Sequence, residues 1–138
     1  MRPAPPRILE YPLGEGWTVL VGRSDADNDR LTLRLARPDD HWLHVRGWPG
    51  SHVLLRGPAG ELPARSRLEQ AAAIAAWHSK ARDGGVVPVS CTLARHVTKP
   101  RGAKPGSVEI RRETVLKVRP ARPGGTLPPG GTLPPGGA

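Results

Sequence analysis

The chain has 138 residues, which is long enough for one domain with a modest core. No apolar run approaches the ~20 residues of a membrane-spanning helix, and the opening residues MRPAPPRILEYP lack the apolar segment of a secretory signal. We therefore expect a cytoplasmic protein with no membrane partner. The single cysteine, Cys91, excludes an internal disulfide and fits a reducing compartment.

The formal net charge of +9 is concentrated in one segment. Residues 1–94 carry twelve Arg or Lys against ten Asp or Glu, a net of +2, whereas residues 95–122 carry nine against two, a net of +7. A near-neutral body with one basic segment is the charge distribution of a protein that binds a polyanion. The alternative is a solvated surface in a protein that is simply rich in arginine.

Both ends of the chain are rich in proline. Residues 1–12 hold four prolines and are expected to form a flexible arm. Residues 123–138 repeat PGGTLP and offer only two leucines for burial, which predicts a disordered tail. The folded domain is therefore expected over residues 13–122.

The first half of this domain is expected to form an antiparallel meander. Residues 17–22 are apolar and β-branched, which predicts a buried strand, and the Asp-rich residues 23–29 predict a turn. Three leucines alternate with other residues over 31–36, the period-2 pattern of a half-exposed strand. Further strands are expected at 42–46 and 51–56, joined by the turn Gly47-Trp-Pro-Gly50.

One main helix is expected at about residues 66–83. Ser66 and Glu69 have the spacing of a capping box, and small apolar residues follow at helical spacing. Lys80 and Arg82 would complement the helix dipole, and Gly84 would end the helix.

The segment after this helix predicts more of the sheet. Residues 86–92 read as an edge strand, because Pro88 cannot donate a ladder hydrogen bond. Residues 108–110 and 114–118 predict a final hairpin. The fold class expected is α+β, a mostly antiparallel β-sheet with the one main α-helix packed on it.

The loop KPRGAKPG at residues 99–106 is the strongest candidate for binding chemistry. Three cations lie within six residues, on a backbone stiffened by two prolines and opened by two glycines. Phosphate recognition needs charge at a fixed reach and approachable amides, whereas the absence of a Walker A pattern argues against nucleotide hydrolysis. The alternative is a hairpin connection that is merely basic. The candidate phosphate contacts in and around the loop are Arg95, Lys99, Arg101, Lys104, Arg111 and Arg112.

Residues 40–52 contain three histidines, and only His44 and His52 are expected to face one another. No further ligand completes a tetrahedral set, so we expect no metal and no cofactor. A hydrolase built on Ser51, His52 and Asp40 lacks a nucleophile elbow, so we do not expect an enzyme. The least favoured alternative is a metal-dependent RNA hydrolase that uses His44 and His52.

The same region is expected to extend an RNA-binding surface. Trp48 lies in a turn beside Arg46, where it either stacks on an unpaired base or folds over its own turn. Trp17 and Trp77 are expected in the core. The residues assigned to this part of the surface are His44, Arg46, Ser51 and His52.

Several motifs together resemble the NFACT-R domain (DUF814). They include PGSHV at residues 49–53, SKAR at 79–82 and KPRGAKPG at 99–106, and the resemblance extends from about Gly14 to Pro120. It implies an RNA-binding domain from large proteins of ribosome-associated quality control, which bind tRNA and the large ribosomal subunit. The other domains of those proteins have no room in 138 residues, so a stand-alone RNA-binding module is expected.

The partner implied by this resemblance is tRNA or rRNA, with the large ribosomal subunit as a candidate and no DNA expected. A protein-interaction module is the alternative. In that case the Leu-Pro-Pro repeats of residues 123–138 would be polyproline-type segments that dock on a ribosomal protein.

Overall fold

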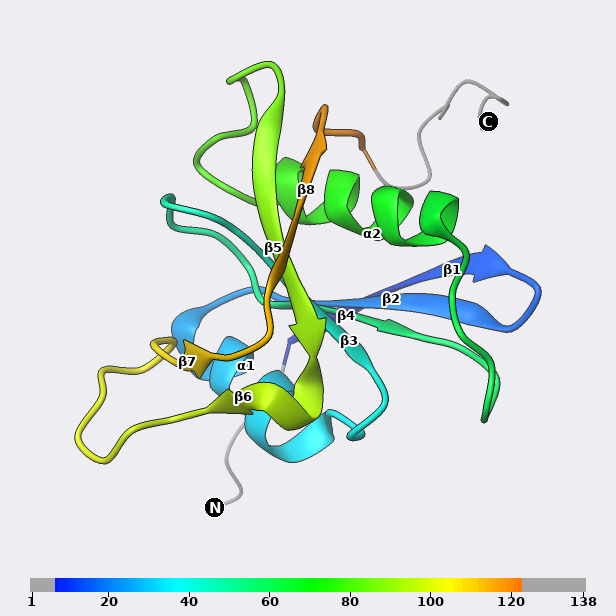
Figure 1. Ribbon diagram of the computed structural model, residues 1–138. Coiled ribbons are helices and arrows are strands. Elements are labelled where there is room, and N and C mark those ends of the chain that lie inside the picture. The colour runs from blue at the N-terminus through cyan, green and yellow to red at the C-terminus, as the bar shows by residue number, and fades with distance from the viewer. Residues whose placement is uncertain (1–6, 123–138) are drawn as a thin grey trace.

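The computed structural model describes residues 7–122, in which a six-stranded antiparallel sheet separates two helical layers (Figure 1). The strand order is β1-β2-β4-β3-β5-β8. The strands, in that order, are Ile8–Gly14, Trp17–Gly22, Val53–Arg56, His41–Val45, Val87–Leu93 and Thr114–Val118. The predicted α+β class is confirmed, and the predicted tail lies outside the described residues.

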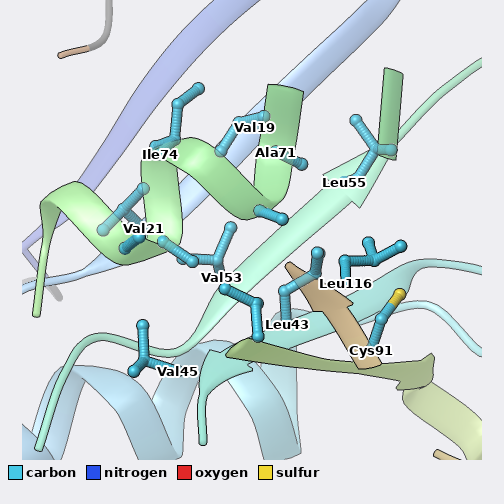
Figure 2. Packing of buried hydrophobic residues seen from close by; sticks show 14 of the residues in the cluster. Val19, Val21, Leu43, Val45, Val53, Leu55, Ala71, Ile74, Cys91 and Leu116 are labelled. Atoms are coloured by element: carbon cyan, nitrogen blue, oxygen red, sulfur yellow. The ribbon is translucent and has the colours of Figure 1, made fainter. Parts of the chain in front are cut away.

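The main helix, α2 (Arg65–Trp77), covers one face of the sheet. Alternate residues of the central strands point toward it and form the larger core cluster (Figure 2). Its alanines let the helix backbone approach the strands closely, and Ala71, Ala72, Ala75 and Ala76 are all completely buried. Cys91 lies in the same cluster, where burial raises the pKa of its thiol to about 11.

The opposite face of the sheet is covered by α1 (Asp25–Arg30) and the π-helical turn η1 (Leu31–Leu35) that continues it. Leu31 packs there on Leu20, Trp42 and Leu54. These strand residues alternate with the ones that face α2. A two-stranded sheet of β6 (Val97–Thr98) and β7 (Glu109–Ile110) lies on this side too. The loop between β6 and β7 therefore projects from the sheet beside α1 (Figure 1).

Residues 25–35 are helical, as α1 and η1, so the turn predicted over 23–29 and the strand predicted over 31–36 were both wrong. Ser24 is the N-cap residue, and its hydroxyl accepts a hydrogen bond from the backbone N–H of Asp27 at 3.1 Å. Leu31 is completely buried, but Leu33 and Leu35 are 43% and 42% exposed. The alternation of leucines therefore did not mark one buried face, because only the first of them reaches the core.

Residues 8–12 belong to β1, so this part of the predicted arm was wrong, and residues 1–6 lie outside the described residues. This strand pairs with β2 through Leu9 and Tyr11, and both side chains pack on the core cluster. Pro12 fits because β1 is an edge strand with an irregularity between Pro12 and Gly14.

Helix α2 differs at both ends from the helix predicted over 66–83. Ala64 is the N-cap residue and makes no side-chain cap bond, so the predicted capping box does not form. Ser66 lies inside the first turn, and Glu69 instead pairs with Arg65 at 3.3 Å. The helix ends at Trp77, which leaves the predicted C-terminal part, residues 78–83, beyond it.

Strand β5 is internal, so its predicted position at an edge was wrong. It pairs with both β3 and β8. The proline is accommodated because Pro88 lies opposite Arg46, one residue past the end of β3, where its carbonyl accepts from the Arg46 N–H at 2.9 Å. The missing donor therefore falls where the ladder ends.

The predicted hairpin of residues 108–110 and 114–118 was also wrong. Strand β7 pairs with β6, and β8 pairs with β5. The intervening residues are held by β5, because the Thr92 hydroxyl donates to the Arg111 carbonyl at 2.6 Å and Ser90 bonds to Glu113. None of the helices within residues 7–122 has the length and apolar character that crossing a lipid bilayer requires.

Candidate nucleic-acid interface

Two of the sequence motifs meet at the C-terminal end of α2. The Ser51 N–H donates to the His78 carbonyl at 3.0 Å, and the Lys80 N–H donates to the Pro49 carbonyl at 2.9 Å. Between these bonds, Gly50 forms an isolated bridge with Ser79. A Cβ at Gly50 would lie 2.8 Å from the Ser79 Cβ, so this close approach requires glycine. The PGSHV and SKAR motifs therefore form one surface.

His52 connects this turn to the basic loop. Its Nε2 lies 3.0 Å from the Gly106 carbonyl oxygen, which only accepts, so Nε2 carries the proton. Nδ1 then accepts from the Thr32 hydroxyl at 2.7 Å, and that hydroxyl accepts from the Trp42 indole N–H at 3.0 Å. His52 is only 2% exposed. It fixes the position of the loop, and its side chain does not reach the surface.

The N-terminal helix supplies the other supports of the loop. The Asn28 side-chain oxygen accepts from the His52 N–H at 3.0 Å, and Asp29 accepts from the Gly106 N–H, also at 3.0 Å. Lys99 pairs with Asp29 at 3.3 Å and donates to the carbonyls of Lys104 and Ser107 at 2.6 and 3.0 Å. Lys99 therefore fastens the loop from within, and its side chain is only 22% exposed.

The other two cations of the loop, Arg101 and Lys104, are exposed. Lys104 lines a hollow of about 430 Å³, and His44 and Gly50 line it as well. The His44 ring stands edge-on to the His52 ring, with centroids 5.7 Å apart, so these two histidines converge as predicted. Burial lowers the pKa of His44, so this wall of the hollow is neutral at pH 7.

The remaining candidate arginines form a separate cluster around His96. Arg111 follows β7, Arg112 has a positive φ of 55°, and Arg95 lies in the 3-10 turn η2 (Ala94–His96). Partial removal from water and the charges of Arg112, Arg111 and Arg95 lower the pKa of His96. Arg95 is paired with Asp39, whereas Arg111 and Arg112 make no ion pair within residues 7–122. The structure thus divides the basic segment into two clusters.

The tryptophans are divided between core and surface. Trp17 is buried, as expected, and Trp48 is 53% exposed. Trp77 is only half-buried, and the Arg82 guanidinium lies over its ring at 4.5 Å. Arg46 is largely exposed, with Nε 4.0 Å from the Glu113 carboxylate.

The side chains weighed above for a hydrolase or a metal site have other partners. Asp40 is buried and paired with Arg56 at 2.6 Å, and within residues 7–122 it makes no hydrogen bond with His52. Both ring nitrogens of His52 are already hydrogen-bonded, so neither has a free lone pair for a metal. No group of three metal-ligating side chains occurs in the part of the chain that the structure describes.

Sequence reasoning missed a second hollow, of about 360 Å³, which the residues of the Pro49–Ser51 turn also line. Arg23, Lys80 and Arg82 line it. A count of charge along the chain missed these residues because they come from two distant segments of near-neutral sequence. The SKAR motif was the available signal, but Lys80 and Arg82 were assigned to the helix dipole.

The buried state of His52 makes stability depend on pH. Burial, followed by the neighbouring His44, lowers the pKa of His52 to about 4 from 6.5. Between these values the unfolded chain binds a proton and the folded one does not, so stability falls as pH decreases from about 6.5 to 4. The expected loss is about 3 kcal/mol. NMR titration of the histidine rings tests this, and a midpoint above pH 6 for His52 would contradict it.

These features define a class of protein: a small α+β domain that presents exposed cations on a loop fixed by buried polar side chains. Such a surface suits a polyanion. The chain belongs to the NFACT protein RNA binding domain family, whose model matches residues 10–112.

The chain is also similar to several known proteins. It is 43% identical over 119 residues to the Rqc2 homolog RqcH of Bacillus subtilis and 37% identical over 102 residues to that of Streptococcus suis. These matches cover 86% and 74% of this chain but only 20% and 18% of the relatives. The solved C-terminal part of the fibronectin/fibrinogen-binding protein from Streptococcus suis matches with a TM-score of 0.75 and 36% identity, over 88% of this chain and 47% of that one.

Proposed function

We propose that this chain binds RNA, either tRNA or rRNA, in association with the ribosome and its quality control. The family model describes an RNA-binding domain, and the curated relatives carry the name Rqc2 homolog. The chain spans about a fifth of the length of those relatives. We therefore propose the binding step alone for this chain, without any activity that depends on their other parts.

The loop at residues 99–106 is the observation that carries this proposal. Its exposed cations, Arg101 and Lys104, stand on a backbone held by Lys99, Asp29 and His52. A preorganised loop binds phosphate without an ordering cost at the moment of association. The arginine pair Arg111 and Arg112 offers a second contact region. Lys99 and Arg95, which are engaged in ion pairs, contribute by holding the backbone in place.

This arrangement predicts the salt dependence of RNA binding. Four exposed cations that each neutralise one phosphate give a slope of log K against log salt of about −3 to −4. Replacing Arg101 and Lys104 with alanine should reduce the magnitude of the slope by about 1.5 and weaken binding about equally for different sequences. Fluorescence anisotropy with a labelled tRNA, measured over a series of salt concentrations, reports both quantities.

The matched control is the double variant Arg34→Ala and Lys117→Ala, which removes the same charge from exposed positions in η1 and β8. Equal effects of the two double variants, or binding that does not respond to salt, would overturn the proposal. Deletion of residues 123–138 tests the docking alternative. Loss of ribosome association with unchanged RNA affinity would favour that alternative.

A further inference from the structure

The second hollow has the chemistry of an anion site. Arg23, which follows β2, and Lys80 and Arg82, which follow α2, contribute three cations to its lining. Ser24 and Ser51 line it as well, and their hydroxyls can donate hydrogen bonds. Charged and neutral donors therefore face one concave space that was formed by segments far apart in the sequence.

The three cations are available for a ligand. None of Arg23, Lys80 and Arg82 forms an ion pair with an acidic group within residues 7–122, whereas six other cations do. Arg82 is oriented by two contacts with Trp77: its Nε donates to the Trp77 carbonyl at 2.9 Å, and its guanidinium lies over the indole ring. Both contacts leave its terminal nitrogens unused in the described chain, and these can bind a phosphate in bidentate fashion.

A purely structural role accounts less well for these side chains. Helix α2 ends at Trp77 and has no basic residue in its last turn, so Lys80 lies beyond the turn in which a cation stabilises the dipole. The backbone of Lys80 is nevertheless fixed by its bond to the Pro49 carbonyl. The pKa of His78, which lines the hollow, is lowered first by burial and then by the positive charges of Arg82 and Arg23.

The two hollows are neighbours. Both are lined by Asp25, Asn28, Pro49 and Gly50, and Lys104 lines one of them whereas Lys80 lines the other. Asp25 is exposed at this boundary and lies against Gly106. Because Asp25 lines both hollows, its carboxylate repels an anion bound in either of them.

We propose that the hollow of Arg23, Lys80 and Arg82 holds a phosphate of the RNA backbone, so that a strand bound at Lys104 crosses the Pro49–Ser51 turn and continues into it. This inference rests on the proposed function and adds a path for the strand. None of the residues of the arginine cluster around His96 lines either hollow, so the cluster is not part of the proposed path.

The test measures binding of a single-stranded RNA oligonucleotide to the full chain and to the double variant Arg23→Gln and Lys80→Gln. We expect affinity to fall about tenfold and the magnitude of the salt slope to fall by about 1.5, as for two lost phosphate contacts. The matched control is Arg34→Gln with Lys117→Gln. A circular dichroism spectrum verifies that each variant is folded.

The outcomes separate this inference from the proposed function. If the Arg101 and Lys104 variant loses affinity but the Arg23 and Lys80 variant behaves as its control, the second phosphate position is overturned and the proposed function stands. If neither variant differs from its control, both fail.

The variant Asp25→Asn provides an independent reading, because it removes charge at the boundary and leaves every cation in place. Binding that becomes tighter, by a factor that decreases as the salt concentration rises, supports the proposed path. Unchanged affinity contradicts it. In the unmodified chain, addition of the oligonucleotide should also raise the midpoint of the His78 ring titration, since a bound phosphate offsets the neighbouring arginines.

Discussion

Replacement of His52 with alanine is expected to lower the free energy of unfolding by about 4 kcal/mol. The variant loses a buried ring and leaves the Gly106 carbonyl without its donor and the Thr32 hydroxyl without its acceptor. The cost combines the cavity left by the ring with the burial of two unpaired polar groups. Guanidinium denaturation followed by tryptophan fluorescence measures the change.

The control for this variant is His96→Ala, because His96 is partly exposed and its ring makes no hydrogen bond within residues 7–122. That substitution should change stability by less than about 0.5 kcal/mol. Two further readouts separate the loop from the core: hydrogen exchange at Gly106 should accelerate, and RNA affinity should fall even where the variant remains folded. Equal stability of the two variants would show that the His52 contacts do not hold the loop.

Replacement of Asp40 with alanine is expected to lower the free energy of unfolding by about 3 kcal/mol. Asp40 is 4% exposed, accepts from Arg56 at 2.6 Å and caps the Arg37 N–H at 2.9 Å. Its removal leaves the Arg56 guanidinium with only the Leu35 carbonyl as a partner in the described chain. Because the Arg56 side chain is 23% exposed, water compensates part of this loss.

A double-mutant cycle isolates the pair. The variant Asp40→Ala with Arg56→Met removes both charges and should recover about 1 kcal/mol or more relative to Asp40→Ala alone. If Asp40→Ala costs less than about 1 kcal/mol, the pair is not stabilising. RNA affinity should not change in folded samples, since Asp40 and Arg56 lie in a different hollow from Lys104 and Lys80.

The central strands β2, β4, β3 and β5 and the middle of α2 were predictable because burial and sequence period agree in them. Residues 17–22 are continuously apolar, and the strand there has one face on α2 and the other on α1. The alanines of α2 recur at helical spacing and are all buried. In both elements the spacing of apolar residues follows from the side chains that contact a neighbouring layer, so the spacing predicts the element correctly.

The start of a helix was mispredicted where two segments carry the same capping pattern and only tertiary contacts determine which serine is the N-cap residue. Ser24 and Asp27 have nearly the same spacing signature as Ser66 and Glu69, but only Ser24 caps a helix. The second signature fails because α2 begins one residue earlier, at Arg65. No local pattern specifies which of these serines is the last extended residue before a helix.

The candidate site was predictable only in part, for a related reason. Loop 99–106 is contiguous in sequence, so its charge was visible directly. Lys99 has the same charge as Lys104, and only the structure distinguishes the lysine that fastens the loop from the exposed one. The hollow of Arg23, Lys80 and Arg82 requires the bridge between Gly50 and Ser79, a contact that no short sequence window contains.

The close approach of Gly50 to Ser79 also bears on how such a domain can diverge. Any side chain at Gly50 would collide with Ser79, so substitution there alters the backbone on which both hollows depend. The surrounding cations are exposed side chains and can be exchanged without disturbing that backbone. Substitution of the exposed cations that line the hollows can therefore change which ligand is bound while Gly50 is retained. Ligand specificity can evolve separately from folding.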